Sequence, residues 1–282
     1  MTKDSGRQTK KRVAVGRRRF ALLSLLLIFC TLSCTKENRV EKEADPLFVL
    51  SGAGLKCVLD PLAEEFTKET GIEVEYSYLC SAMLLTNLEL THQGDVFVAG
   101  AKYYFNLARD KGLVDEEHMV IAGYQVPCIM VQEGNPKNIQ SLDDLLKPGM
   151  RLGVGDFEAM AVGRLAKEML KRAGILDQFM KNVVVVGGSA PKLCLPVCMN
   201  SIDAAINLTA TAKTFDHCSD IVLIDKERVM YSTFPVALTI YARKIEEAMK
   251  YYNFMQCPKA RKILEKYGYG IYFDPKAEQY LE

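Results

Sequence analysis

Short apolar segments typical of buried strands alternate along this chain with amphipathic segments of helical period, and this alternation constrains the fold most. We expect strands at residues 48–50, 72–78, 95–98, 126–131, 151–154, 183–186, 204–208 and 221–224. We expect helices from Leu55, at 82–92, at 103–111, at 162–173, from Pro191, at 244–255 and at 258–267. Strands that alternate with helices of about ten to sixteen residues predict an α/β fold, with mostly parallel sheets and right-handed crossovers. The strands are numerous enough for two sheets.

The segment F-V-L-S-G-A-G-L at residues 48–55 joins a strand to a helix through a turn of small residues. The first N–H groups of a helix have no partner inside the helix and lie at the positive end of its dipole, so they can bind an anion. Glycine lets a ligand approach the backbone. Such turns are also common in α/β proteins where they bind nothing, so this turn alone does not identify a site.

Three more strand-to-helix junctions share these small, neutral residues, at 80–82, 159–163 and 187–190. Together with 51–54 they place two junctions in each half of the chain. We expect their helix N-termini to converge on one anion across a cleft. Lys56 and Lys192 fall in first helical turns, where a bound anion would compensate their charge, or where their ammonium groups extend into water.

The N-terminus has the features of an export signal. A basic region precedes the apolar residues 20–32, and Ser33 then precedes Cys34. We interpret residues 1–33 as a signal peptide, Cys34 as a lipidated first residue and residues 34–45 as a flexible tether. A plain signal peptide or an uncleaved anchor is the alternative, and the arginines before Phe20 resemble a twin-arginine signal weakly. The expected location is the periplasm or the outer face of the cytoplasmic membrane, through a lipid anchor.

Composition and motifs exclude several classes of function. The net charge is +1 over 282 residues with no basic stripe, so we expect no nucleic-acid partner. The chain has no H-E-x-x-H, G-x-S-x-G or P-loop motif, and its three histidines show no metal-ligand spacing. We therefore expect no enzyme activity, no cofactor and no resident metal.

The cysteines leave a second hypothesis open. Seven lie beyond Cys34, and an odd number requires at least one free thiol or an intermolecular bond. Cys57, Cys80 and Cys194 lie close to the proposed cleft, and a helix N-terminus favours the thiolate form. Under this second hypothesis the chain is a thiol-based soft-metal or redox-handling protein on the same scaffold, with these three cysteines as its functional residues. The other interpretation is that these cysteines are small buried apolar residues.

Five segments carry a resemblance to a known family. They are F-V-L-S-G-A-G-L (48–55), E-F-T-K-E-T-G-I-E-V (65–74), G-D-V-F-V-A-G-A (94–101), S-L-D-D-L-L-K-P-G-M-R-L-G-V-G-D (141–156) and K-Y-G-Y (266–269). Over about residues 47–270 the chain resembles the periplasmic molybdate- and tungstate-binding proteins of ABC importers, of the ModA type. The resemblance implies a type II periplasmic-binding-protein fold with a ligand cleft between two lobes. Lobe 1 is then 46–124 with 236–282, and lobe 2 is 125–235.

The resemblance also implies a ligand and site residues. The family's serine after the first strand falls on Gly54, and its ligand tyrosine falls on Leu208, so both hydroxyls are lost. The serine of the second turn matches Ser81, and two backbone donors fall on Val162 and Ala190. The implied function is that of a monomeric, extracytoplasmic solute-binding lipoprotein, which captures molybdate or tungstate and delivers it to an ABC transporter permease.

Overall fold

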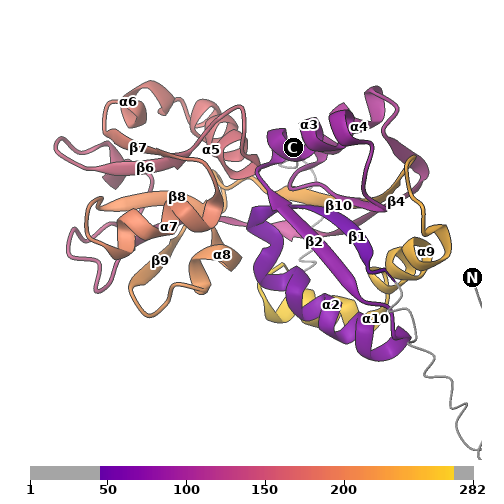
Figure 1. Cartoon of the computed structure of the whole chain (residues 1–282). Coiled ribbons are helices and arrows are strands. Elements are labelled where there is room, and N and C mark those ends of the chain that lie inside the picture. Colours follow the sequence, from indigo (N-terminus) through magenta and orange to yellow (C-terminus); the bar gives the residue numbers. More distant parts are fainter. Residues whose placement is uncertain (1–44, 270–282) are drawn as a thin grey trace, which may run out of the picture. The chain divides into compact units, whose positions relative to one another are not determined.

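Two five-stranded sheets organise residues 45–269, the part of the chain that the computed structural model describes (Figure 1). The first sheet has the order β2 (Val74–Leu79), β1 (Leu47–Gly52), β3 (Val96–Val98), β10 (Ser232–Thr239) and β4 (Val114–Gln125). The second has the order β7 (Val183–Gly187), β6 (Leu152–Gly155), β8 (Ala204–Leu208), β5 (Pro127–Gln132) and β9 (Ser219–Leu223). Each sheet with its helices is one lobe, called lobe 1 and lobe 2 below.

Helices cover both faces of the sheet in lobe 1. The 3₁₀ turn η1 (Ala53–Leu55) and α2 (Lys56–Thr70) follow β1, and α2 packs on one face with α9 (Ile245–Phe254) and α10 (Pro258–Lys266). On the other face α3 (Ser81–Thr91) and α4 (Lys102–Asp110) bury Leu84, Leu88 and Phe105 against Leu50 and Phe97. Lobe 1 therefore has three layers, helices on both sides of the sheet.

Lobe 2 is also layered. On one face of its sheet lie α5 (Ala161–Arg172), α6 (Leu176–Met180) and the 3₁₀ turn η2 (Asp143–Leu146), with Met169, Leu170 and Phe179 in the core. On the other face lie α7 (Ala190–Cys198) and α8 (Thr209–Lys213), which bury Leu193 and Ala212. The predicted two-lobe α/β class is confirmed.

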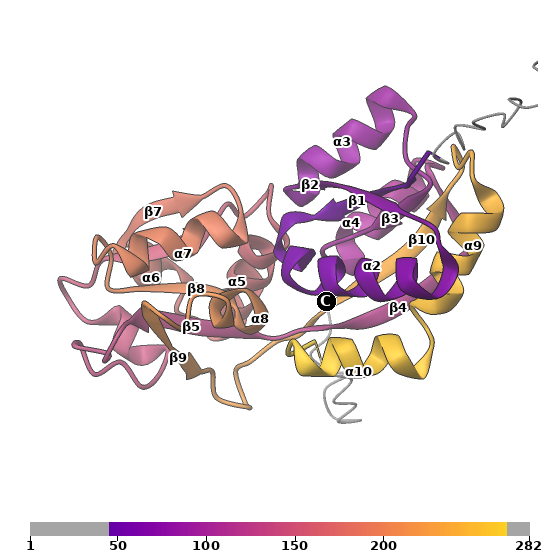
Figure 2. The same cartoon turned by 60° about the horizontal axis from the view of Figure 1, so that its bottom comes forward.

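The expectation of mostly parallel strands needs correction, because both sheets are mixed. In lobe 1, β1 pairs in parallel with β2 and β3, whereas β10 pairs antiparallel with β3 and β4. In lobe 2, β6 pairs in parallel with β7 and β8, whereas β5 pairs antiparallel with β8 and β9. The strands that run antiparallel to their neighbours are therefore β10 in lobe 1 and β5 in lobe 2. Each of them adjoins one of the two connections between the lobes, β4 to β5 and β9 to β10 (Figure 2).

Two of these strands, β4 and β10, are absent from the sequence-based prediction. β4 begins with four polar residues, D-E-E-H after Val114, which mask its strand pattern. β10 contains Pro235, which normally counts against an internal strand. The structure accommodates this proline at a register shift between Phe234 and Pro235, where the ladder is interrupted.

The predicted signal peptide, tether and lipidated Cys34 lie outside the described residues. Among residues 45–269, no helix is long and apolar enough to span a bilayer.

Candidate functional site

A small cavity lies where the two lobes meet, and residues of both lobes line it. Its volume is about 30 Å³, roughly a tenth of the ~300 Å³ at the lower end of small-molecule sites. A ligand enclosed here must therefore be very small. The lining residues are Gly52, Ala53, Gly54, Leu55, Leu79, Cys80, Ser81, Gly100, Gln125, Met160, Ala161, Val162, Ser189, Ala190 and Leu208.

All five residues predicted from the sequence line this one cavity. Gly54 and Ser81 come from lobe 1, and Val162, Ala190 and Leu208 come from lobe 2. The topology explains their meeting, because each follows or ends a strand at the carboxyl edge of its sheet, where ligands of α/β proteins bind.

Four helical N-termini reach the cavity, those of η1–α2, α3, α5 and α7. For the first three, the N-cap residues Gly52, Cys80 and Met160 make no capping side-chain bond. Only α7 is capped, by Ser189 Oγ, which accepts from the N–H of Lys192 at 3.4 Å. Uncapped N–H groups at the positive ends of helix dipoles are anion donors.

Ser81 presents a free hydroxyl to the cavity. Its side chain is only 4 % exposed, and Oγ has no hydrogen-bond partner among the described residues. It faces Gly100, where a Cβ atom would lie 2.9 Å from Ser81 Oγ. Ser81 is the first residue of α3, and the N-cap position belongs to Cys80. The hydroxyl is therefore available to a ligand and does not cap the helix.

Gly54 and Leu208 are in close contact across the lobes. A Cβ atom at Gly54 would lie 3.3 Å from Leu208 Cδ1 and 3.5 Å from the Cβ atom of Ala190. The Leu208 side chain thus occupies the space beside Gly54, so these two positions contribute an apolar wall and backbone groups.

Gly100 and Gln125 line the cavity but were missed by sequence reasoning. The Gln125 amide donates to the carbonyl oxygen of Gly100, and the Gln125 side chain is 2 % exposed. Gly100 allows close approach, because a Cβ atom there would also lie 3.2 Å from Ala161 Cβ. Gly100 belongs to the segment 94–101 that carries the family resemblance, whereas Gln125 ends the unpredicted strand β4.

Among residues 45–269, no charged side chain lines the cavity. Lys56 pairs with Asp60 at 2.6 Å and lies over the Tyr78 ring, and Lys192 is exposed. Asp156 accepts from the N–H groups of Glu158 and Ala159, so it organises the loop before α5. The two lysines do not contribute charge to the cavity wall, so the donors that the described residues offer there are neutral.

A second set of contacts joins the lobes beside the cavity. The N–H of Ala82 donates to the Ala159 carbonyl at 3.1 Å, and the Tyr104 hydroxyl donates to the Glu158 carbonyl at 2.8 Å. The Arg164 guanidinium lies 3.4 Å from the centre of the Tyr103 ring, a cation–π contact. These contacts hold α3 and α4 of lobe 1 against the start of α5 in lobe 2.

The cysteines do not form the cluster that the second hypothesis requires. Cys80 lines the cavity, but Cys57 and Cys194 do not. Burial raises the pKa of Cys57, and burial raises the pKa of Cys194 to about 12, which favours the protonated thiol in both. Within residues 45–269 no three His, Cys, Asp or Glu side chains are placed to hold a metal ion. Of the three thiols that the second hypothesis uses, the cavity lining contains Cys80 alone.

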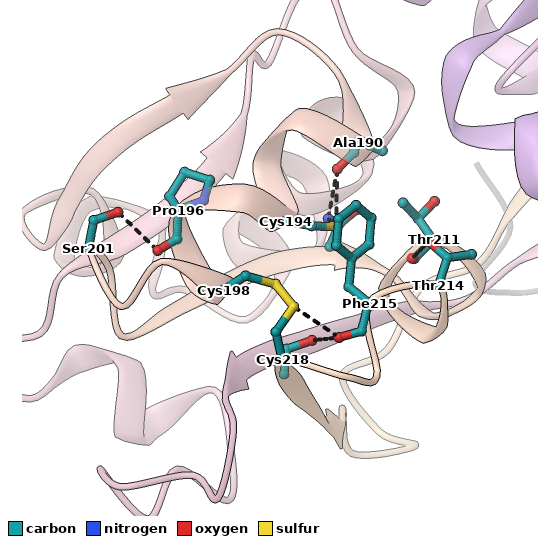
Figure 3. The surroundings of a disulfide bond; sticks show 11 residues. Ala190, Cys194, Pro196, Cys198, Ser201, Thr211, Thr214, Phe215 and Cys218 are labelled. Carbon is teal, nitrogen blue, oxygen red and sulfur yellow. Dashed lines mark hydrogen bonds between the residues drawn. A yellow bond between two sulfur atoms is a disulfide. The ribbon is translucent and has the colours of Figure 1, made fainter.

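A disulfide joins two other cysteines in lobe 2 (Figure 3). It links Cys198, the last residue of α7, to Cys218, just before β9, with Cα atoms 5.0 Å apart. Cys57, Cys80, Cys128, Cys194 and Cys257 are free. The disulfide therefore fixes the end of α7 opposite to the end that lines the cavity.

The fold and the cavity together define a two-lobe α/β binding protein with its ligand site between the lobes. Residues 47–270 match the bacterial extracellular solute-binding protein family, and the chain belongs to it. The molybdate-binding protein ModA of Escherichia coli is 24 % identical over 228 residues, 79 % of this chain and 88 % of that protein.

Two solved structures share the fold. The periplasmic molybdate-binding protein of Azotobacter vinelandii has a TM-score of 0.68 at 16 % identity, over 80 % of this chain and 99 % of its own. The sulfate-binding protein SubI of Mycobacterium tuberculosis has a TM-score of 0.74 at 18 % identity, over 83 % of this chain and 89 % of its own. The chain is a solute-binding protein of the ABC-transporter type, as the family resemblance predicts.

Proposed function

We propose that this protein captures a tetrahedral oxyanion, molybdate or tungstate, outside the cytoplasmic membrane and delivers it to an ABC permease. One observation carries the proposal: four helical N-termini, two from each lobe, converge on a cavity of about 30 Å³ with no charged side chain in its wall. A small dehydrated dianion fits neutral, preorganised N–H donors of this kind. The relatives described as molybdate- and sulfate-binding proteins support the same ligand class.

We assign the ligand contacts to backbone N–H groups around Gly54, Val162 and Ala190 and to the hydroxyl of Ser81. Leu208 closes the apolar side of the cavity against Gly54. Hydrogen bonds to a charged ligand are about twice as strong as neutral ones, so a few backbone donors suffice without a cation.

Isothermal titration of the purified mature chain with molybdate, tungstate, sulfate and phosphate tests the ligand class. We expect molybdate and tungstate to bind at least tenfold more tightly than sulfate and phosphate. A chain that binds none of the four, while circular dichroism and melting show it folded, would contradict the proposal.

We also propose a lipid anchor at Cys34, on the sequence pattern alone. Mass spectrometry of the protein purified from detergent-extracted membranes should find an N-terminal diacylglycerol-modified cysteine. Cys34→Ser should release the protein from the membrane fraction. A mature N-terminus elsewhere, without lipid, would leave the binding function intact and remove the anchor.

A further inference from the structure

The carbonyl oxygen of Gly54 lies at the centre of a small hydrogen-bond cluster. The Tyr269 hydroxyl donates to it at 2.8 Å, and the Thr211 hydroxyl donates to it at 3.3 Å. A carbonyl oxygen has two lone pairs and each hydroxyl has one proton, so this pairing satisfies both donors. The Cys57 sulfur lies 3.4 Å from the Tyr269 hydroxyl and completes the cluster.

The two donors come from different lobes. Tyr269 follows α10 in lobe 1, is 1 % exposed, and packs edge-on against Phe234 with ring centres 5.5 Å apart. Thr211 is on α8 of lobe 2 and is 2 % exposed. Its neighbour Ala210 packs into the hydrophobic core of lobe 1, so α8 is one of the segments of lobe 2 that pack on lobe 1.

Gly54 lies in the turn of small residues that lines the cavity. Two hydrogen bonds accepted by its carbonyl oxygen restrict the rotation of this turn, whose glycines have few steric limits of their own. Burial raises the pKa of Tyr269 far above its usual value, so the hydroxyl keeps its proton.

We propose that Thr211 and Tyr269 are positioning residues of the anion site. They hold the Gly54 carbonyl from both lobes and so fix the 51–54 turn in its binding geometry. Neither residue lines the cavity, and they act only through this turn. Because Thr211 acts from the opposite lobe, the contact couples lobe closure to the geometry of the turn. The inference rests on the proposed anion-binding function for its effect on affinity, but not for its effect on the turn.

The test uses conservative variants of the full mature chain. Thr211→Val and Tyr269→Phe each remove one hydroxyl at nearly constant side-chain shape. Thr211→Ser keeps the hydroxyl and removes only the methyl group. Thr214→Val is the matched control (Figure 3), because Thr214 Oγ1 donates to the Thr211 carbonyl at 2.7 Å at the end of the same helix. The hydrogen bonds to the Gly54 carbonyl come from other side chains. Melting temperatures verify that every variant folds.

Two measurements are made on each variant. Molybdate release by stopped flow should be about 2- to 10-fold faster in Thr211→Val and Tyr269→Phe, the range for one lost hydrogen bond. Amide hydrogen exchange of the ligand-free chain should rise in the peptide that covers residues 48–58. Thr211→Ser and Thr214→Val should behave as the wild type in both. The double variant should exceed the product of the single effects, because it leaves the carbonyl without either donor.

The outcomes separate this inference from the proposed function. If wild-type protein binds molybdate and Thr211→Val changes neither release nor exchange, the positioning role is refuted and the ligand class stands. If no oxyanion binds but exchange of the turn rises in Thr211→Val and Tyr269→Phe only, the positioning role stands and the ligand class is refuted. Equal effects of Thr214→Val would reduce Thr211 to a helix-stabilising residue and overturn the inference.

Discussion

Replacement of Ser81 by alanine should weaken anion binding without weakening the fold. Two hydroxyls of the described residues lie in the cavity wall: Ser189 Oγ accepts from the N–H of Lys192 and caps α7, whereas Ser81 Oγ has no such role. A hydrogen bond to a charged group contributes about 1–3 kcal/mol, so Ser81→Ala should raise the dissociation constant for molybdate and tungstate about 5- to 150-fold.

Ser81→Ala should have little effect on the free energy of unfolding, because the Ser81 hydroxyl does not cap α3. Cys80 holds the N-cap position of α3, and Ser81 Oγ has no partner among residues 45–269. Loss of an N-cap costs about 1 kcal/mol, whereas loss of an unpartnered hydroxyl should change the free energy of unfolding by less than about 0.5 kcal/mol. Ser189→Ala, which does remove a cap, is the positive control for stability.

Calorimetric titration and urea denaturation on the same samples decide whether the Ser81 hydroxyl binds the ligand or stabilises α3. We expect Ser81→Ala to lose affinity at an unchanged denaturation midpoint, and Ser189→Ala to lose about 1 kcal/mol of stability. If Ser81→Ala unfolds at lower urea and binds both anions as the wild type does, the hydroxyl stabilises α3 and our placement of the ligand at this turn is wrong.

Three further predictions concern a contact between the lobes, the disulfide and the free thiols. Tyr104→Phe removes one hydrogen bond between the lobes, so molybdate release in stopped flow should be about 2- to 10-fold faster. The melting temperature should stay nearly constant. An unchanged release rate would mean that this contact does not hold the lobes closed. The double variant Cys198→Ser with Cys218→Ser opens a loop with a sequence separation of 20. It should lose about 3 kcal/mol of unfolding free energy by the chain-entropy relation, and an unchanged urea midpoint would contradict that assignment. Burial raises the pKa of Cys194 to about 12, so this thiol is protonated at pH 8 and should resist alkylation at that pH until the protein unfolds. Cys80 should react in the native protein and be protected by molybdate, as peptide mass spectrometry can measure; equal labelling of both thiols would refute this difference.

The cavity could be placed from the sequence because its wall consists of strand-to-helix junctions. In an α/β fold such junctions lie at the carboxyl edge of a sheet, so Gly54, Ser81, Val162 and Ala190 needed only the correct fold class to be brought together. Thr211 and Tyr269 could not be found in this way. They lie 157 and 215 residues from Gly54 along the chain, and only tertiary packing makes them neighbours.

Prediction from the local sequence pattern failed at positions where tertiary packing decides the structure. Pro235 argues against a strand, yet β10 pairs on both sides because the proline coincides with a register shift. The helix α8 has five residues, T-A-T-A-K, too few for a helical period to be visible. For the thiols, a first-turn position predicts a lowered pKa, but burial of Cys57, the second residue of α2, raises its pKa instead. Sequence spacing gives the position along a helix and not the dielectric around the side chain.

Gly54 and Leu208 stand where the ModA-type proteins that the chain resembles have a serine and a tyrosine, so two hydroxyls are lost. The two substitutions are structurally linked, because the side chains at these positions are neighbours. Leu208 Cδ1 already lies where a side chain on residue 54 would have to fit, because even a Cβ atom at that position would be 3.3 Å away. A serine at 54 would therefore crowd Leu208, and a glycine at 54 leaves room for it. The consequence is a wall that is apolar on one side and supplies backbone N–H donors on the others. Because no charged side chain of residues 45–269 lies in that wall, the anion selectivity that we propose depends on the fixed spacing of those donors. The proposed role of Thr211 and Tyr269 in fixing the 51–54 turn therefore predicts that their variants also change the relative affinities for different anions.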